Sequence, residues 1–246
     1  MEKTINMKIH AHIIAYNEEK ILPFTLDYYS SICDKIFIYD NMSNDSSDVI
    51  YKRYPKLTVF KWESQNSLND LYNAQIKSGC YKEYSKDADW VIVCDCDELL
   101  YHPNLIEKLK EYDKQGISLP KVNGYEMFSE EFPNYDGELI TDKIKHGSDI
   151  VPTLCKQIVF KPNVNLTYTV GAHSNHCPDC VSNYIPELKL LHYKFLNLEY
   201  VINRYKILND RLSDLNKTNG WGHHYKESRA VNFFNELKGS NKILID

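Results

Sequence analysis

The segment Trp90-Val91-Ile92-Val93-Cys94-Asp95-Cys96-Asp97-Glu98 joins an apolar run directly to three acids. A short apolar run bounded by polar residues is typical of a strand that is covered on both faces. The acids would then lie at the carboxyl end of this strand, where open α/β sheets bind their ligands. Asp95 and Asp97 form a DxD motif whose two carboxylates can reach one hard cation. The expected occupant is Mn²⁺ or Mg²⁺ holding a diphosphate, and the alternative is that both acids only cap the next element.

Strands and helices alternate on the amino-terminal side of this motif. The apolar pattern predicts strands over 7–15, 35–40, 57–62 and 89–94, and helices over 21–29, 46–54 and 67–85. Such regular alternation implies an α/β fold with a mostly parallel central sheet, right-handed crossovers and flanking helices. The ligand crevice is expected at the carboxyl edge of that sheet.

The pattern after the motif is less regular. It predicts a helix over 104–112, a strand over 118–122 that ends at Asn123-Gly124, and a long loop over 129–150. Further strands are predicted over 157–160, 166–170 and 188–192, followed by an amphipathic helix over 195–212. We expect a catalytic domain over 1–194, divided into a nucleotide-binding half (1–100) and an acceptor-side half (101–194), and a C-terminal helical segment over 195–246.

Composition excludes some classes of function. The 246 residues carry a formal net charge of -5, and the pI is near 6.0, which argues against a general nucleic-acid binder. No apolar stretch approaches the ~20 residues that span a bilayer, and no signal peptide is recognisable. The expected location is the cytoplasm, with peripheral association at the inner face of a membrane left open. The sequence makes no prediction of the oligomeric state.

The seven cysteines form an odd set, and two of them flank Asp95. Reduced, mostly buried thiols fit this distribution better than a disulfide framework. The cluster from His173 to Cys180 holds two histidines and two cysteines within eight residues. A plain loop is the main interpretation of this cluster, and a zinc site or a redox CxxC pair are the alternatives.

Three groups of residues at predicted strand ends resemble one known family. They are Ala15-Tyr16-Asn17-Glu18-Glu19, Tyr39-Asp40-Asn41 with its Ser- and Asp-rich turn, and Asp95-Cys96-Asp97-Glu98. Together they resemble the GT-A fold glycosyltransferases of the family 2 type. The resemblance is specific over about the first 100 residues and thinner to about residue 225. It implies a metal-dependent transfer of a sugar, with inversion, from a nucleotide-diphosphate donor, with UDP-sugars favoured, to a hydroxyl of a glycan, lipid-linked glycan or surface-polysaccharide acceptor.

The resemblance also implies roles for particular residues. Nucleotide contacts are expected from the strand ends, from the helix before the DxD motif and from a lysine facing the diphosphate: Ala15, Tyr16, Asn17, Glu18, Asp40, Asn73, Asp95 and Lys156. The metal ligands would be Asp95 and Asp97, joined by His192 or His173. The base that takes the acceptor's proton is expected after the DxD motif, as Glu130 ahead of Glu126 and Glu131, with Asp142 a more distant option.

Two other functions are compatible with the same motif. A strand that ends in Asp-x-Asp also occurs in phosphatases of the haloacid dehalogenase kind, although there it normally ends the first strand. The second alternative is a nucleotide- or glycan-binding module that has the fold but no turnover. Loss of turnover in a folded Asp97→Ala variant would separate an enzyme from such a module.

Overall fold

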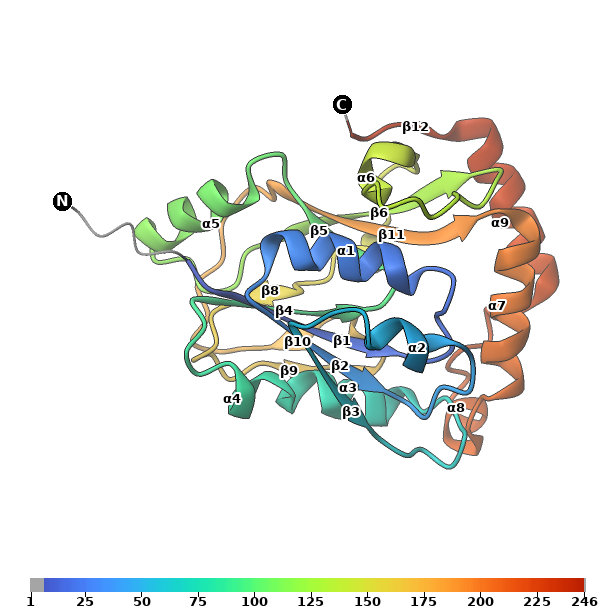
Figure 1. Cartoon of the computed structure of the whole chain (residues 1–246), viewed down its shortest axis with the longest axis horizontal. Helices are drawn as coiled ribbons and strands as arrows, with labels where there is room; N and C mark the ends of the chain where they lie inside the picture. Colours follow the sequence, from blue (N-terminus) through green and yellow to red (C-terminus); the bar gives the residue numbers. More distant parts are fainter. Residues whose placement is uncertain (1–6, 246) are drawn as a thin grey trace.

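The computed structural model describes residues 7–245 (Figure 1). Its central sheet has the strand order β3-β2-β1-β4-β8. Four of these strands run parallel, β1 (Ile9–Ala15), β2 (Lys35–Asp40), β3 (Leu57–Lys61) and β4 (Trp90–Asp95), and β8 (Val159–Phe160) runs antiparallel to β4. One face carries α1 (Leu22–Ile32) and α2 (Ser47–Tyr51), and the other carries α3 (Asp70–Gly79) and α4 (Tyr81–Tyr84) (Figure 1). The predicted fold class, a mostly parallel α/β sheet flanked by helices, is therefore confirmed.

Alternation along the strands determines which side chains reach each face. Trp90, Ile92 and Cys94 of β4 belong to the main core on the α1 side, while Val91 and Val93 pack in a second cluster on the α3 side. Because successive side chains of a strand point to opposite faces, Asp95, two residues after Val93, points to the same face as Val93, toward α3. The parity of β4 thus directs the first acid of the DxD motif toward α3.

A second sheet stacks beyond α1, with the strand order β12-β7-β6-β11-β5. Its strands are β5 (Glu98–Tyr101), β6 (Val122–Ser129), β7 (His146–Gly147), β11 (Leu188–Leu196) and β12 (Lys242–Ile243). The smaller elements around it are α5 (Leu105–Lys114), α6 (Ile140–Lys143), the 3-10 turns η1 (Pro152–Leu154) and η2 (Val170–Ala172), and the hairpin of β9 (Thr167–Tyr168) with β10 (Asn175–His176).

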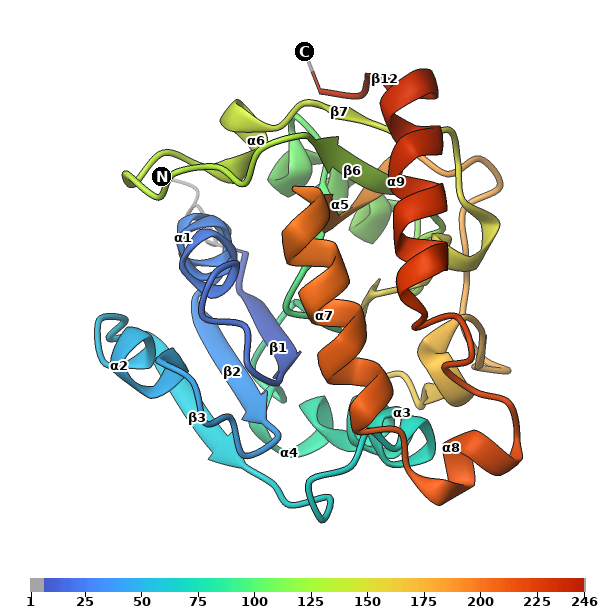
Figure 2. The same ribbon diagram turned by 90° about the vertical axis from the view of Figure 1, so that its right-hand side faces the viewer.

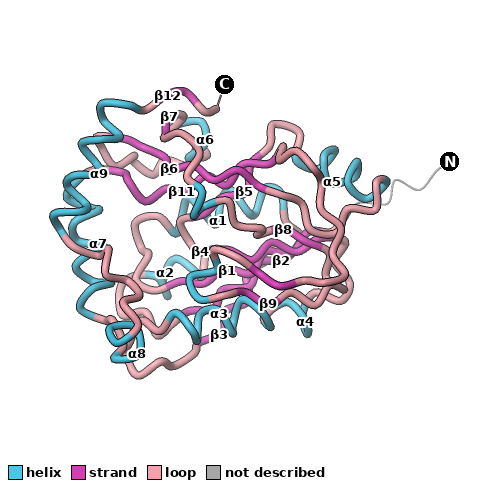
Figure 3. The backbone as a smooth tube through the Cα atoms, turned by 180° about the vertical axis from the view of Figure 1, so that it is seen from behind, coloured by secondary structure: helices cyan, strands magenta, loops and turns pink. Residues whose placement is uncertain are grey.

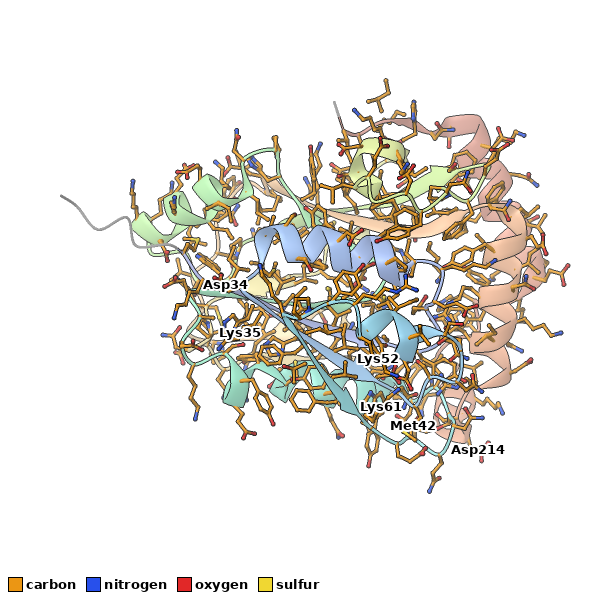
Figure 4. The ribbon with its side chains drawn as sticks, viewed as in Figure 1. Asp34, Lys35, Met42, Lys52, Lys61 and Asp214 are labelled. Carbon is orange, nitrogen blue, oxygen red and sulfur yellow. A yellow bond between two sulfur atoms is a disulfide. The ribbon has the colours of Figure 1, made fainter. Side chains whose placement is uncertain are left out.

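The carboxyl-terminal helices stand across the ends of the central strands. Helices α7 (Leu198–Asp210), α8 (Asp214–Thr218) and α9 (Glu227–Ser240) lie on the side toward which β1 and β2 run (Figures 1 and 2). Seen from behind, they form one edge of the molecule, and α5 lies at the opposite edge (Figure 3). Met42 and Lys61 lie toward Asp214 of α8, whereas Asp34 and Lys35 lie at the other end of β2 (Figure 4). No helix within residues 7–245 has the length and apolar character needed to cross a membrane.

Several predicted elements differ from the structure, among them the loop predicted over 129–150, which contains α6 and β7. The strand predicted over 118–122 begins instead at Val122 and continues through Gly124. Glycine at this position lets η1 pack directly against the strand, because a Cβ on Gly124 would lie 2.2 Å from the Leu154 carbonyl oxygen. The helix predicted over 195–212 begins at Leu198, since β11 continues to Leu196 and Asn197 caps the helix. The helix predicted over 67–85 is divided into α3 and α4.

The cysteines also differ in part from the prediction. Cys177 and Cys180 are joined by a disulfide, so the expectation of reduced thiols is wrong for this pair. The bonded pair has no thiolate to offer to zinc. The remaining five are free, as predicted, and three of them are buried in the core: Cys33, Cys94 and Cys96.

Candidate functional site

A cavity of about 420 Å³ lies at the carboxyl ends of the central strands, where α/β sheets bind ligands. Its volume is in the range of small-molecule sites. Ten of the residues predicted from the sequence line it: Ala15, Tyr16, Glu18, Asn73, Asp95, Asp97, Glu126, Lys156, His173 and His192. They come from both sheets and from the segments between them, so the fold brings together residues that are far apart in the sequence.

The turn that carries the DxD motif is fixed by the third acid, Glu98. This side chain is fully buried; its Oε2 accepts a hydrogen bond from the Asp95 backbone N–H at 3.0 Å, and its Oε1 pairs with Lys156 Nζ at 2.5 Å. Burial alone would raise the pKa of Glu98, but the charges of Lys156 and Lys77 outweigh it and lower the pKa. Glu98 therefore stays ionised beneath the motif and positions it.

One wall of the cavity is cationic, and we call Asp95, Lys77 and Lys156 the lysine wall. Lys77 Nζ donates to Asp95 Oδ2 at 2.8 Å, and Lys156 Nζ lies 3.8 Å from the same oxygen. Lys77 comes from α3, the helix that β4 faces with Asp95. Lys156 precedes β8, and continuing the register that pairs Ile92 with Val159 places it opposite Asp95.

The opposite wall is formed by the second sheet, and we call Asp97, His192 and Glu126 the histidine wall. In that sheet β11 pairs His192 with Glu126 of β6 on one side and with Glu98 of β5 on the other. His192 Nε2 lies 3.2 Å from Asp97 Oδ2. His192 Nδ1 lies 2.8 Å from Glu126 Oε2, close enough for an ion pair although not aligned as a hydrogen bond.

The histidine wall holds a charged imidazole. Burial lowers the pKa of His192, but the carboxylates of Glu126 and Asp97 outweigh it and raise the pKa to about 10. The same charge acts on Asp97: burial raises its pKa, and the imidazolium of His192 brings the pKa well below its usual range. At neutral pH the wall therefore consists of an imidazolium flanked by carboxylates.

The third wall lies at the ends of β1 to β3 and is closed by α7. Tyr16, Asn41 and Trp62 line the cavity here. The Arg211 guanidinium lies 3.2 Å from the centroid of the Tyr16 ring, and its Nη2 donates to Asn41 Oδ1 at 2.5 Å. Arg204 Nη1 donates to the Tyr16 carbonyl at 3.0 Å, and Arg204 also pairs with Glu18. The two arginines thus tie the C-terminal segment to the strand ends.

Two residues predicted to contact the nucleotide serve the scaffold in this structure. Asn17 bonds reciprocally with Asn44, which joins the turn after β1 to the turn after β2. Asp40 is fully buried, accepts hydrogen bonds from the Tyr51 hydroxyl and the Ser43 backbone, and pairs with Lys61. Neither residue is part of the cavity lining.

The three candidate bases are separated by the structure. Glu126 lines the cavity, whereas Glu130 is exposed and pairs with Lys238, and Glu131 is also exposed. His173 lines the cavity, and its Nδ1 donates to the Thr153 carbonyl at 2.8 Å. Among the predicted bases, the geometry therefore favours Glu126.

Several residues of the site were missed in the sequence. Lys77 carries a readable signal, because Asp70, Asn73, Ala74 and Lys77 recur at the spacing of one helix face, and all four line the cavity. Arg204 and Arg211 carry no such signal, since their place depends on how α7 docks. The same holds for Tyr225, whose ring centroid lies 5.0 Å from Lys194 Nζ.

The side chains predicted to bind a divalent cation are already engaged with one another and with lysines. Both ring nitrogens of His192 already face carboxylates, Nε2 that of Asp97 at 3.2 Å and Nδ1 that of Glu126 at 2.8 Å. Asp95 is already neutralised by Lys77. Within residues 7–245, no three His, Cys, Asp or Glu side chains form a group that could hold a metal ion. As they are arranged, the residues do not fit a resident Mn²⁺ or Mg²⁺.

No protein-family model and no curated protein sequence matches the chain. Solved structures show similarity at low identity. The crystal structure of S. aureus TarS is 10% identical with a TM-score of 0.42, over 94% of this chain and 43% of that chain. S. aureus TarS 1-349 in complex with UDP-GlcNAc is 10% identical with a TM-score of 0.44, over 94% of this chain and 72% of that one. The crystal structure of 4-diphosphocytidyl-2C-methyl-D-erythritol synthase is 13% identical with a TM-score of 0.36, over 54% of this chain and 66% of that chain.

The chain thus spans less than half of the TarS chain, and 63% and 72% of its 1-349 form in the two structures of that form. At 10 to 13% identity and with TM-scores below 0.5, these similarities carry no weight for function.

Proposed function

We propose that the protein is a glycosyltransferase that moves a sugar from a nucleoside-diphosphate donor to an acceptor hydroxyl, with a UDP-sugar as the favoured donor. The observation that carries the proposal is the cavity itself. At the carboxyl ends of parallel strands it combines buried cations, Lys77 and Lys156, with a carboxylate, Glu126, on the other side. A transfer of this kind needs a cationic site for the leaving diphosphate and a base for the acceptor.

Each wall would have one task. Tyr16, Asn41 and Trp62 offer ring faces and amide groups to base and ribose. The lysine wall would face the diphosphate. In the transfer, the bond between the anomeric carbon and the β-phosphate oxygen breaks, and its electron pair stays on the phosphate.

The proton of the acceptor hydroxyl would pass to Glu126 as the hydroxyl oxygen bonds to the anomeric carbon from the opposite face, which inverts the configuration. His192 would hold the Glu126 carboxylate in place through the 2.8 Å ion pair. The predicted acceptor, a glycan, lipid-linked glycan or surface polysaccharide, belongs to the proposal. The cation predicted from the sequence stays a prediction, and no step here depends on it.

The phosphatase alternative is less well supported. The DxD motif follows the fourth strand of the chain, and the first Asp, which would have to be the nucleophile, is bonded to Lys77. A binding module without turnover would use the same cavity, so only a measurement of turnover separates it from an enzyme.

The experiment is a turnover assay on the full chain with UDP-sugars and GDP-sugars, offered with and without glycan acceptors, in which released nucleoside diphosphate is measured. We expect release by the native chain and its loss in the Asp97→Ala variant, with folding checked by circular dichroism. Unchanged release of nucleoside diphosphate by Asp97→Ala would show that the DxD motif does not take part in the reaction. Failure of the native chain to consume any donor would contradict the enzyme function.

A further inference from the structure

Lys77 and Lys156 are the most unusual residues of the cavity. Both are buried, at 4% and 6% exposure, and each has the counter-charge that a buried lysine requires, Asp95 for Lys77 and Glu98 for Lys156. Within residues 7–245 the Lys77 ammonium group makes one hydrogen bond, to Asp95, although it carries three N–H donors. Since Lys77 lines the cavity, it can donate to a ligand there.

The charges around the cavity are balanced by the chain itself. Five Asp and Glu side chains line it, and so do five Lys and Arg side chains. A carboxylate site that recruits a divalent cation needs an excess of acids, because the cation's charge has to be offset. The lining therefore has no negative excess for a metal ion to neutralise.

The geometry of the DxD motif agrees with this balance. Asp95 Oδ2 already accepts from Lys77 at 2.8 Å and lies 3.8 Å from Lys156. A divalent cation on that oxygen would stand within a few ångströms of two ammonium groups, which repel it. A diphosphate would instead be attracted to both.

We propose that Lys77 and Lys156 bind the diphosphate of the donor directly, in the place where a divalent cation was expected, so that nucleoside diphosphate binds without metal. The inference rests on the proposed function. In it, Asp95 orients the two ammonium groups, and the charge that develops on the leaving β-phosphate is stabilised by the chain's own cations.

The test is calorimetric titration of UDP into the full chain in three arms: with EDTA, with Mg²⁺ and with Mn²⁺. We expect dissociation constants that agree within about threefold across the arms. Binding that occurs only with a metal ion, or is at least about tenfold tighter with one, overturns this inference but leaves the proposed function intact. No binding of UDP or GDP in any arm overturns both.

A pair of variants locates the effect. In EDTA, Lys77→Met is expected to weaken UDP binding by about 10-fold to 100-fold, the cost of a charged hydrogen bond. The affinity for uridine, which has no phosphate, should stay unchanged and shows that the variant is folded. Lys52→Met removes a positive charge from an exposed position outside the cavity and should bind UDP as the native chain does. Native-like UDP affinity in Lys77→Met would contradict the assignment.

Discussion

The lysine wall and the histidine wall each hold one acid of the same DxD motif but differ in chemistry. Asp95 lies on the α3 side of the central sheet, where Lys77 and Lys156 neutralise it. Asp97, two residues later, turns to the second sheet, where His192 neutralises it. Two acids that look equivalent in the sequence thus enter different electrostatic environments, because the strand ends between them.

The difference indicates a division of labour. The lysine wall presents ammonium donors, which suit a phosphate. The histidine wall presents a carboxylate, Glu126, held by an imidazolium, which suits the handling of a proton. If this division is correct, changes in one wall should affect binding, and changes in the other should affect turnover.

The largest effect is expected from Glu126→Gln. Removing a general base lowers turnover by about 10²-fold to 10⁴-fold, while the affinity for UDP should stay at the native value. Donor consumption and UDP titration measure the two quantities. Glu107→Gln, an exposed glutamate on α5, serves as a control. Native-like turnover in Glu126→Gln, with the loss found in Glu130→Gln instead, would show that the base lies outside the histidine wall.

The next largest effect is expected at Glu98, the buried acid that positions the DxD motif between the two walls. Glu98→Gln leaves the buried ammonium of Lys156 without its nearest counter-charge, at 2.5 Å. Breaking a buried pair in this way costs about 3 to 5 kcal/mol of unfolding free energy. Urea unfolding measures it. Glu111→Gln, which removes the exposed partner of Lys108, is the matched control and should unfold like the native chain. Equal stability of both variants would contradict a supporting role of Glu98.

A smaller loss of stability is expected from Gly124→Ala. The added Cβ would lie 2.2 Å from the Leu154 carbonyl oxygen and would force apart β6 and η1, which lead to Glu126 and Lys156. Overpacking of this kind costs about 1 to 3 kcal/mol. Gly79→Ala, which meets nothing within 4 Å on α3, should be neutral or stabilising. A thermal unfolding series compares the two, and a stable Gly124→Ala would show that β6 and η1 can separate freely.

The smallest effect is the pH dependence of stability that arises from His12, a buried histidine with surroundings unlike those of His192. His192 has carboxylates on both sides, whereas His12 of β1 contacts the Ser85 and Tyr39 hydroxyls, and burial lowers its pKa from 6.5 to about 3. The unfolded chain therefore takes up a proton below pH 6.5 that the folded chain takes up only near pH 3. Stability is fully present above pH 6.5 and falls by about 1.4 kcal/mol by pH 5.5.

This prediction is measured by urea unfolding at pH 7.5 and pH 5.5. The His12→Gln variant should lose that part of the pH dependence, although it is less stable throughout. A native pH dependence in His12→Gln would mean that other groups cause the loss.

The central sheet could be predicted from the sequence because its signals are local. The apolar run of β4 and the acids after it give both the strand and the site at its end, and the spacing from Asp70 to Lys77 gives one face of α3. The contacts within the histidine wall could not be predicted in this way, although its three residues are candidates from the sequence. Its members, Asp97, Glu126 and His192, meet only through the pairing of β5, β11 and β6, and no short-range pattern encodes that register.

The C-terminal segment shows the same limit. Arg204 and Arg211 reach Tyr16 because α7 crosses the strand ends, and the sequence shows an amphipathic helix without showing where it docks. The Gly124 position was misread for a related reason, since a glycine that admits a neighbouring segment looks the same in sequence as one that makes a turn.

The most direct test of the two-wall account is the dissociation constant of UDP for Lys77→Met and Glu126→Gln, measured side by side by calorimetry in EDTA. The account predicts that Lys77→Met loses about 10-fold or more in affinity and that Glu126→Gln binds UDP like the native chain. Equal losses in both variants, or a loss in Glu126→Gln alone, would contradict the division between a phosphate-binding wall and a proton-handling wall.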